Sequence, residues 1–347
     1  MITEQLREYL QNSKPIFEDI LGQDECKKSL ASALLAGRHI ILVGPPGVGK
    51  TTLAKDVSKL LPDIKIVEGC SYNCTPDNPS CISCRQSKKL TAKKIPGEQR
   101  FVRIQGSPDL TVEDLLGDID PVKAFKYGAL SIESFTPGKI FKANNGVLFF
   151  DEMNRCPEKI QNALLQVLEE KKATINSYEV NFDIDFIFIG TMNPEDSSTE
   201  KLSDVLVDRF DFIYMGYPET IDIEKKIILQ KGIKLADVGD NMLGIIAFFV
   251  RLLREDSNLE KKPSVRASIG LYERAQSNAL LNKRNYVVFD DIKQSLISVL
   301  AHRISLKPSV KYLKSAEDYL KEKFEKNMKQ ASSGIEDTEE QNSGDYR

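Results

Sequence analysis

The chain has 347 residues, of which 41% are hydrophobic and 29% charged, and its formal net charge is −3. This is the composition of a globular protein of about two domains. The small negative charge gives no overall basic field of the kind that attracts nucleic acid, and no apolar run approaches the roughly 20 residues that cross a bilayer. Because the first 14 residues are polar and lack a signal-peptide core, we expect a cytoplasmic protein.

A glycine-rich loop follows the first apolar run. Ile40–Val43 is typical of a strand buried on both faces, and Thr51–Leu61 predicts a helix closed by Pro62. The loop between them matches the phosphate-binding pattern Gly-x4-Gly-Lys-Thr, in which backbone N–H groups and a helix N-terminus face the phosphates. Lys50 is predicted to reach the β and γ phosphates, and the Thr51 hydroxyl to hold Mg²⁺. The predicted nucleotide-binding residues are Gly44, Pro45, Pro46, Gly47, Val48, Gly49, Lys50, Thr51 and Thr52.

Four of the six cysteines follow the predicted helix at close spacing: Cys70, Cys74, Cys81 and Cys84. Four thiolates so close together can form a tetrahedral site, and structural zinc is our first interpretation. An iron–sulfur cluster is the second, and a metal-free thiol group or a regulatory disulfide is the third. Because the loop is distant in sequence from the predicted catalytic residues, we expect a structural or partner-docking role. The other two cysteines, Cys26 and Cys156, are interpreted as packing residues.

Four more apolar runs follow: Phe101–Ile104, Val147–Phe150, Phe186–Ile189 and Phe212–Met215. Continuous rather than alternating apolar character predicts a parallel sheet covered by helices on both faces. The segment Pro157–Glu170 supports this, because its apolar residues fall on one stripe of a helix. The predicted fold class is therefore α/β, with a five-stranded parallel sheet.

Polar side chains stand at the ends of two of these runs. Asp151 could hold the Mg²⁺ that bridges the β and γ phosphates, and Glu152 could polarise the attacking water. Asn193 follows the Phe186–Ile189 run and could orient that water or contact the γ-phosphate. By itself this pattern favours an ordinary Asn-Pro turn that ends a strand.

Two segments interrupt this alternation: residues 124–143 are expected to form a hairpin or strand-rich insertion, and residues 171–185 another hairpin. From the pattern alone, both could equally be surface loops. From residue 219 the pattern becomes helical, at residues 221–231, 241–254, 268–281 and 289–304, which predicts a second, all-helical domain at 219–328. The first domain is placed at 1–218, with a cysteine-rich insertion at 69–96. Residues 329–347 have little to bury and are expected to be a disordered acidic tail.

Taken together, these motifs resemble the AAA+ ATPases of the MoxR and magnesium-chelatase I-subunit group. The resemblance extends from about Phe17 to Ile304 and is carried by six motifs in the same order: Gly44–Thr51, Gly146–Arg155, Gly190–Pro194, Val207–Phe210, Pro263–Ser268 and Ala301–Ile304. It implies an AAA+ core followed by a helical lid. MoxR proteins typically lack the four-cysteine loop.

The resemblance also implies roles for single residues. Asp151 and Glu152 match Walker B, Asn193 matches sensor 1, and Gln23 lies in the stretch that abuts the adenine. Arg209 matches the arginine finger that acts on the neighbouring subunit, and Arg266 matches the sensor 2 arginine of the lid. The segments 124–143 and 171–185 match the helix-2 insert and the pre-sensor-1 hairpin.

The expected protein is therefore a Mg²⁺-dependent ATPase that works as a homo-oligomeric ring, with a hexamer as the expected size. By resemblance it would remodel or mature a protein client, or drive metal insertion, together with a separate von Willebrand factor A domain protein. A DNA-dependent motor is one alternative, which the negative charge disfavours, and a nucleotide-gated assembly switch with little turnover is another. A true chelatase subunit is a third, although nothing in the sequence shows a porphyrin site.

Overall fold

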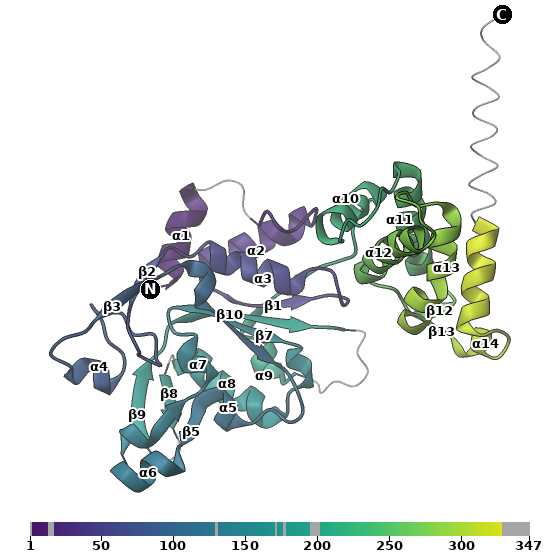
Figure 1. Cartoon of the computed structure of the whole chain (residues 1–347). Coiled ribbons are helices and arrows are strands. Elements are labelled where there is room, and N and C mark those ends of the chain that lie inside the picture. Colours follow the sequence, from purple (N-terminus) through teal and green to yellow (C-terminus); the bar gives the residue numbers. More distant parts are fainter. Residues whose placement is uncertain are drawn as a thin grey trace, which may run out of the picture. The chain divides into compact units, whose positions relative to one another are not determined.

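The computed structural model describes residues 2–12, 17–128, 131–170, 172–175, 178–194 and 202–327 (Figure 1). Contacts divide these residues into two compact units. The first contains the described residues up to Pro45 together with Gly49–Gly216, and the second contains Pro46–Val48 and the described residues from Tyr217 onward. The predicted acidic tail at 329–347 lies outside the described residues. None of the described helices is long and apolar enough to cross a membrane.

A five-stranded sheet forms the centre of the first unit. Its strand order is β11-β1-β10-β7-β4, and every neighbouring pair in it is parallel. The bounds are β1 His39–Val43, β4 Phe101–Gln105, β7 Gly146–Asp151, β10 Phe186–Met192 and β11 Phe210–Tyr214. These strands cover the first four predicted apolar runs and all but the last residue of Phe212–Met215, so the predicted parallel sheet is confirmed.

Different helices cover the two faces of the sheet. Successive residues of each strand point to opposite faces, so each strand contributes side chains to both cores. Leu148 and Phe150 of β7 belong to a core that includes Ile160 and Leu164 of α8. On the other side, α3 packs against β7 and β10, and α2 packs against β1 and β11. Figure 1 shows α2 and α3 on one side of the sheet and α7 and α8 on the other. Besides α4 and α6, which are described below, the α-helices described in this unit are α1 Ile2–Asn12, α2 Asp24–Ala36, α3 Lys50–Lys59, α5 Val112–Leu116, α7 Lys139–Lys142, α8 Glu158–Glu170 and α9 Asp204–Val207.

Three small ladders project from this unit. β2 (Ile64–Val67) and β3 (Ala92–Ile95) pair antiparallel at the base of the cysteine-rich loop, which carries the short helix α4 (Ile82–Gln86). β5 (Gly117–Ile119) pairs with β6 (Phe135–Pro137). β8 (Lys172–Ile175) pairs with β9 (Tyr178–Asp183), while residues 171, 176 and 177 of the predicted hairpin lie outside the described residues.

The segment 124–143, expected to be a hairpin or strand-rich insertion, contains the short strand β6 together with helical segments. It begins within a helix, α6 (Pro121–Tyr127), and contains the turn η2 (Ile132–Ser134) before β6. The Asp120 carboxylate accepts hydrogen bonds from Val122 N and Lys123 N, and Pro121 occupies the first turn, so a complete helix start precedes the predicted segment. The strand that pairs with β6 also lies before residue 124.

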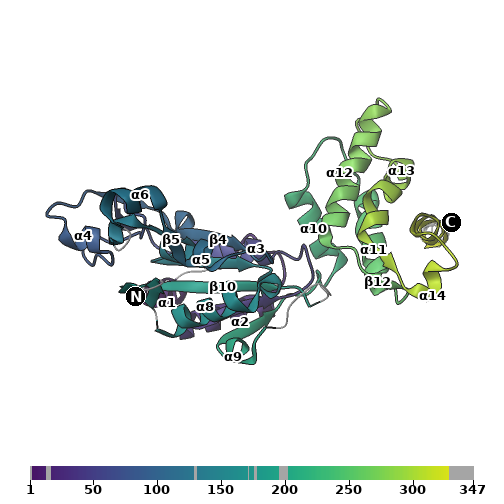
Figure 2. The same cartoon turned by 90° about the horizontal axis from the view of Figure 1, so that it is seen from below.

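The second unit is built from α10 Ile221–Lys231, α11 Asp240–Glu255, α12 Val265–Leu281, α13 Phe289–Leu300 and α14 Pro308–Lys311, and residues 316–327 are also helical. Its buried core includes Phe249, Leu271, Leu296 and Phe324. The helices after residue 307 were not predicted, and neither was a small ladder in which β12 (Leu259–Lys261) pairs antiparallel with β13 (Ser305–Leu306). These strands of two and three residues are too short to give an alternating pattern. Figure 2 shows these helices from a second direction.

Candidate nucleotide site and cysteine cluster

The predicted phosphate-binding residues and carboxylates lie at one edge of the sheet. The P-loop follows β1, Asn193 follows β10, and Asp151 ends β7. The register pairs Val43 with Met192, and Gly190 with Phe150, so these three strands end side by side. In open parallel sheets this carboxyl edge is where ligands bind.

The P-loop has the local geometry of a phosphate cradle. Gly47 and Gly49 have positive φ angles of 76° and 107°, and a Cβ on Gly49 would lie 2.9 Å from the Ile20 side chain. The Lys50 ammonium group donates to Gly44 O at 2.6 Å and Pro45 O at 2.9 Å, and Lys50 begins α3. Glycine is therefore needed here, and the loop leads directly into a helix N-terminus, the arrangement that suits phosphate.

The Asp151 carboxylate is held by two neighbouring side chains. The Thr191 hydroxyl donates to Oδ1 at 2.7 Å, and Arg103 Nη2 lies 2.6 Å from Oδ2. Thr191 Oγ1 in turn accepts from Glu152 N at 2.9 Å. Thr51 and Asp151 together offer only oxygen donors, which is the ligand chemistry of Mg²⁺, so this edge fits a Mg–nucleotide complex.

Glu152 stands in an unusual backbone conformation. Its φ angle is 54°, in the left-handed region that residues other than glycine seldom adopt. Its side chain accepts from Gln105 Nε2 at 2.9 Å and pairs with Arg155 at 3.2 Å. A Cβ on Gly106 would lie 2.1 Å from Glu152 O, so only glycine permits this approach. The surrounding chain thus fixes Glu152 in a strained turn at the end of β7, with its carboxylate bonded to Gln105 and Arg155.

Sequence reasoning missed Arg103, Gln105, Gly106 and Thr191. Arg103 and Gln105 belong to β4, in the run Phe-Val-Arg-Ile-Gln. Polar residues alternating within an otherwise apolar strand were the available signal. Their partners were not deducible, because β4 pairs with β7 across more than 40 positions of sequence.

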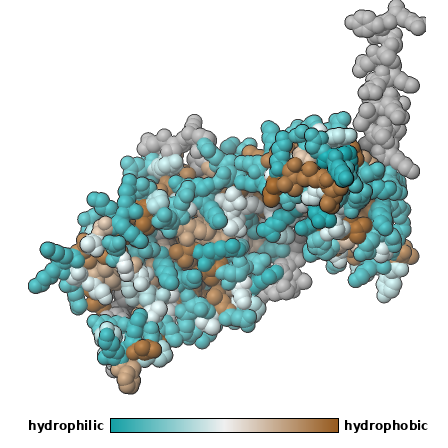
Figure 3. Space-filling view, in the orientation of Figure 1, coloured by the Kyte–Doolittle hydropathy of each residue, from teal (hydrophilic) through white to brown (hydrophobic). Residues whose placement is uncertain are grey.

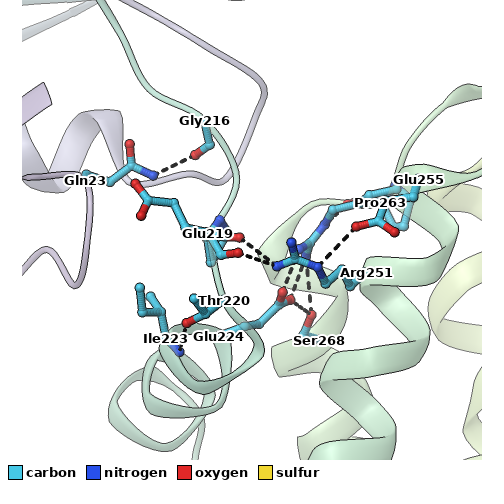
Figure 4. Close-up of polar contacts among 12 residues, drawn as sticks. Gln23, Gly216, Glu219, Thr220, Ile223, Glu224, Arg251, Glu255, Pro263 and Ser268 are labelled. Carbon is cyan, nitrogen blue, oxygen red and sulfur yellow. Dashed lines mark hydrogen bonds and ion pairs between the residues drawn. The ribbon is translucent and has the colours of Figure 1, made fainter. Parts of the chain in front are cut away.

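Two other predicted residues also lie in the first unit. Asn193 is half-buried, and its carbonyl accepts from Asn154 Nδ2 at 3.3 Å. Gln23 directly precedes α2 and has a φ angle of 60°, and its Nε2 donates to Gly216 O at 2.9 Å (Figure 4). Gln23 therefore ties the start of α2 to the last residue of the first unit.

Arg209 lies at the opposite edge of the sheet. It directly precedes β11, whose first residue, Phe210, pairs with His39 at the start of β1. The side chain forms an ion pair with Glu169 and donates to Val205 O at 2.6 Å. A strand of five residues separates this edge from the P-loop, a span of about 15 Å. The structure therefore does not bring Arg209 together with the other predicted residues of its own chain.

Arg266 belongs to the second unit, near the start of α12. A buried cluster fixes this helix start: Arg254 makes two hydrogen bonds to Glu224, of 2.6 and 2.7 Å, and its Nε donates to Pro263 O at 2.9 Å. Ser268 also donates to Glu224, as Figure 4 shows. Because Pro263 lies just before α12, this ion pair orients the turn that carries Arg266.

The four cysteines of the loop come together as predicted. Their sulfur atoms all lie within 4.8 Å of one another, and Cys74, Cys81 and Cys84 are buried. A hydrogen bond from the Cys74 thiol holds the pKa of Cys70 below its ordinary value. Cys26 and Cys156, interpreted as packing residues, are 5% and 0% exposed.

Three family models match the chain. The model of the magnesium chelatase subunit ChlI matches residues 16–92, that of the ATPase family associated with various cellular activities matches 77–212, and that of the AAA lid domain matches 254–322. Together with the sheet order and the P-loop, they define an AAA+ ATPase that hydrolyses ATP with Mg²⁺.

Within that class, the chain is an AAA+ ATPase related to the magnesium-chelatase subunit ChlI. It is 27% identical to a magnesium-chelatase subunit ChlI homolog of Methanocaldococcus jannaschii, covering 84% of this chain and 86% of that one. It is 29% identical to the uncharacterized protein YeaC of Bacillus subtilis, covering 81% and 82%. A structure of the complex between subunits BchI and BchD of magnesium chelatase is 21% identical with a TM-score of 0.47, covering 88% of this chain and 100% of that one.

Proposed function

We propose that the chain hydrolyses ATP at sites shared between the protomers of a ring. The observation that carries this proposal is the separation of Arg209 from the P-loop by the length of the sheet. An arginine side chain cannot cover about 15 Å within its own subunit. It can reach a phosphate only if a second copy presents its carboxyl edge, and a head-to-tail contact of this kind closes into a ring.

In this proposal each residue has one task. Lys50 and the loop from Gly44 to Thr52 hold the phosphates, and Thr51 and Asp151 hold Mg²⁺. Glu152 takes the proton of the attacking water, and Asn193 orients that water. Arg209 of the neighbouring copy neutralises charge that develops on the γ-phosphate oxygens, for which a rigid, permanently charged guanidinium is suited. Arg266 senses the same phosphate from the lid, and Gln23 lies against the adenine.

The segment around α6 is proposed to contact the client. Val122 is 80% exposed and Phe125 97% exposed, and both lie on this short helix between β5 and β6. Figure 3 shows apolar colour at the lower tip of the molecule, where α6 lies in Figure 1. Exposed apolar side chains of this size mark surfaces that bind other proteins. We propose that this helix-2 insert and the β8–β9 hairpin transmit nucleotide-driven movement to a protein client.

The activity of the protein on this client is proposed from the proteins to which the chain is related. The relatives include magnesium-chelatase subunits, and BchI forms a complex with BchD. We therefore propose protein remodelling, maturation or metal insertion, with a separate von Willebrand factor A domain protein as partner and a ring of six copies. The alternatives are a DNA-dependent motor and an assembly switch with little turnover.

The proposal is tested by the dependence of ATPase activity on assembly. We expect the specific ATPase rate to rise with protein concentration, in parallel with a ring seen by sedimentation. Turnover at full rate by a protein that stays monomeric with every nucleotide would contradict the shared site. DNA that stimulates turnover, with an effect that falls as salt rises, would favour the motor. Glu152→Gln, loaded with ATP in native extract, would retain the client for identification.

We further propose that Cys70, Cys74, Cys81 and Cys84 bind a metal, with zinc preferred to an iron–sulfur cluster. Support comes from their mutual distances and their burial. Elemental analysis of the purified protein tests this proposal independently of the ATPase activity.

A further inference from the structure

The spacing of the four sulfur atoms distinguishes a single ion from a cluster. A tetrahedral ion with metal–sulfur bonds of about 2.3 Å places its sulfur ligands about 3.8 Å apart. Cys70 Sγ and Cys81 Sγ are 3.8 Å apart, and no pair of the four is separated by more than 4.8 Å. The cysteines of a four-iron cluster are bound to different irons and stand roughly 6 Å apart. The arrangement therefore fits one metal ion.

Backbone groups around the cluster are arranged to stabilise negative charge on sulfur. Tyr72 N donates to Cys70 Sγ at 3.4 Å, Cys81 N donates to Cys74 Sγ at 3.3 Å, and Cys84 N donates to Cys81 Sγ at 3.4 Å. Hydrogen bonds of this kind are the outer shell that orients metal ligands and tunes their charge. Four thiolates with three such donors suit a divalent cation, and zinc has no geometric preference that opposes the tetrahedron.

The cysteine loop is bound to the connection that enters β7. Asn144 Nδ2 donates to Tyr72 O at 3.1 Å, Asn145 Nδ2 donates to Asn73 O at 3.1 Å, and Asn73 Nδ2 donates to Lys142 O at 2.5 Å. The rings of Tyr72 and Phe141 also meet edge to face, with centroids 5.3 Å apart. All these contacts join the stretch between Cys70 and Cys74 to the five residues before β7, residues 141–145.

The same connection also holds the entry to β10. Asn144 Oδ1 accepts from Asp185 N at 3.1 Å, and Asn145 N donates to Asp185 O at 2.7 Å. Asp185 joins the β8–β9 ladder to β10, and Asn144 follows the β5–β6 ladder through α7. Arg100 adds a further bond to Asn145 O at 2.5 Å, and burial lowers the pKa of Arg100 to about 10. The two inserted ladders thus share one hydrogen-bonded junction with the cysteine loop.

We propose that Cys70, Cys74, Cys81 and Cys84 hold a single zinc ion, and that this ion fixes the junction where both inserted ladders join the sheet. The loop from residue 68 to 91 has almost no apolar core of its own, so the ion supplies the energy that keeps Tyr72 and Asn73 in place. The loop then braces Asn144 and Asn145, which hold Asp185. This inference rests on the proposed metal site and is independent of the proposed ring.

Metal analysis is the first arm of the test. We expect one zinc per chain in wild-type protein, and the same in Cys26→Ser, the matched variant of a buried cysteine outside the cluster. Cys81→Ser/Cys84→Ser should lose the zinc. One iron per chain, four irons per chain, or no metal with four titratable thiols would each overturn the assignment of a single zinc ion.

Hydrogen exchange of the full chain is the second arm. We expect removal of zinc from wild-type protein by a chelator to speed exchange about tenfold or more at residues 142–146 and at Asp185, and not in α3. Asn144→Ala should keep its zinc and still lose protection at Asp185, which separates the brace from metal binding even if the double cysteine variant does not fold. If removal of zinc speeds hydrogen exchange only within residues 68–91, the metal site does not stabilise the junction and the proposal is wrong.

Discussion

The two edges of the central sheet are built in opposite ways. At the carboxyl edge, Asp151 and Glu152 are partly exposed, and Glu152 is held in a strained backbone conformation. At the amino edge, Asn144 is 5% exposed and uses both its amide nitrogen and its oxygen in hydrogen bonds within the chain. The carboxyl edge keeps polar groups available to a ligand, whereas the polar groups of Asn144 at the amino edge form hydrogen bonds within the chain.

This difference shows that the polarity of a residue does not reveal its role. A buried polar group whose partners are all protein atoms stabilises the fold, whereas a polar group on a strained turn beside a phosphate cradle is available for chemistry. Arg209 is an exception to this division. It lies at the amino edge, but we propose that it acts at the nucleotide site of a second copy, so its removal should behave like a change at the carboxyl edge.

The largest effect is expected for Arg209→Ala. In the assembled protein this variant should bind ATP and lose on the order of 10³-fold or more in kcat, because one cation that neutralises the transferring phosphoryl group is missing. Arg38→Ala is the matched control, since Arg38 is an exposed arginine at the same edge, paired with Asp211. Turnover of assembled Arg209→Ala at the rate of the control would show that Arg209 has no part in hydrolysis.

Glu152→Gln should lower kcat about 10²–10⁴-fold while ATP affinity is retained, because the amide keeps the shape but cannot take a proton. Equilibrium binding of a nucleotide and steady-state hydrolysis measure the two quantities separately. Glu158→Gln, the same substitution at an exposed position of α8, should leave both unchanged. Equal losses in binding and turnover would point to a structural role for Glu152.

Gly106→Ala should lower the free energy of unfolding by about 1–3 kcal/mol, because the added Cβ would overlap Glu152 O. Gly244→Ala is the contrast: it lies within α11, with open space around its Cβ, and should stabilise the protein by about 0.5–1 kcal/mol. Urea denaturation measures both changes. A neutral Gly106→Ala would mean that the turn at Glu152 is not tightly constrained.

The smallest effect on turnover should be that of Asn144→Ala at the amino edge. It leaves Tyr72 O and Asp185 N without their partner and should cost about 1–3 kcal/mol of stability. The ATPase rate per folded molecule should remain within about twofold of wild type, because the change is one strand length from the nucleotide site. Asn241→Ala, at an exposed position, should change neither quantity. A strong loss of turnover with unchanged stability would contradict the structural role of this edge.

The sequence predicted what is local and periodic. The five strands followed from continuous apolar runs, α3 and α8 from stripes and breakers, and the P-loop from its own eight residues. The hydrogen bonds from Asn144 and Asn145 to the cysteine loop join residues 72 positions apart, and no local sequence pattern predicts them. The contacts of Arg103 with Asp151 and of Gln105 with Glu152 depend on strand order, which was not predicted. The helical start of the 124–143 segment was missed even though Asp120-Pro121 signals it.

A mixing experiment tests the central claim of a shared site most directly. Arg209→Ala retains an intact phosphate cradle, and Glu152→Gln retains an intact arginine, so each variant alone should be nearly inactive. In an equal mixture that reassembles at random, about one subunit interface in four combines an intact Glu152 with an intact Arg209. This predicts recovery of about a quarter of wild-type turnover. A mixture that forms mixed rings and remains as inactive as its components would contradict hydrolysis between neighbouring copies.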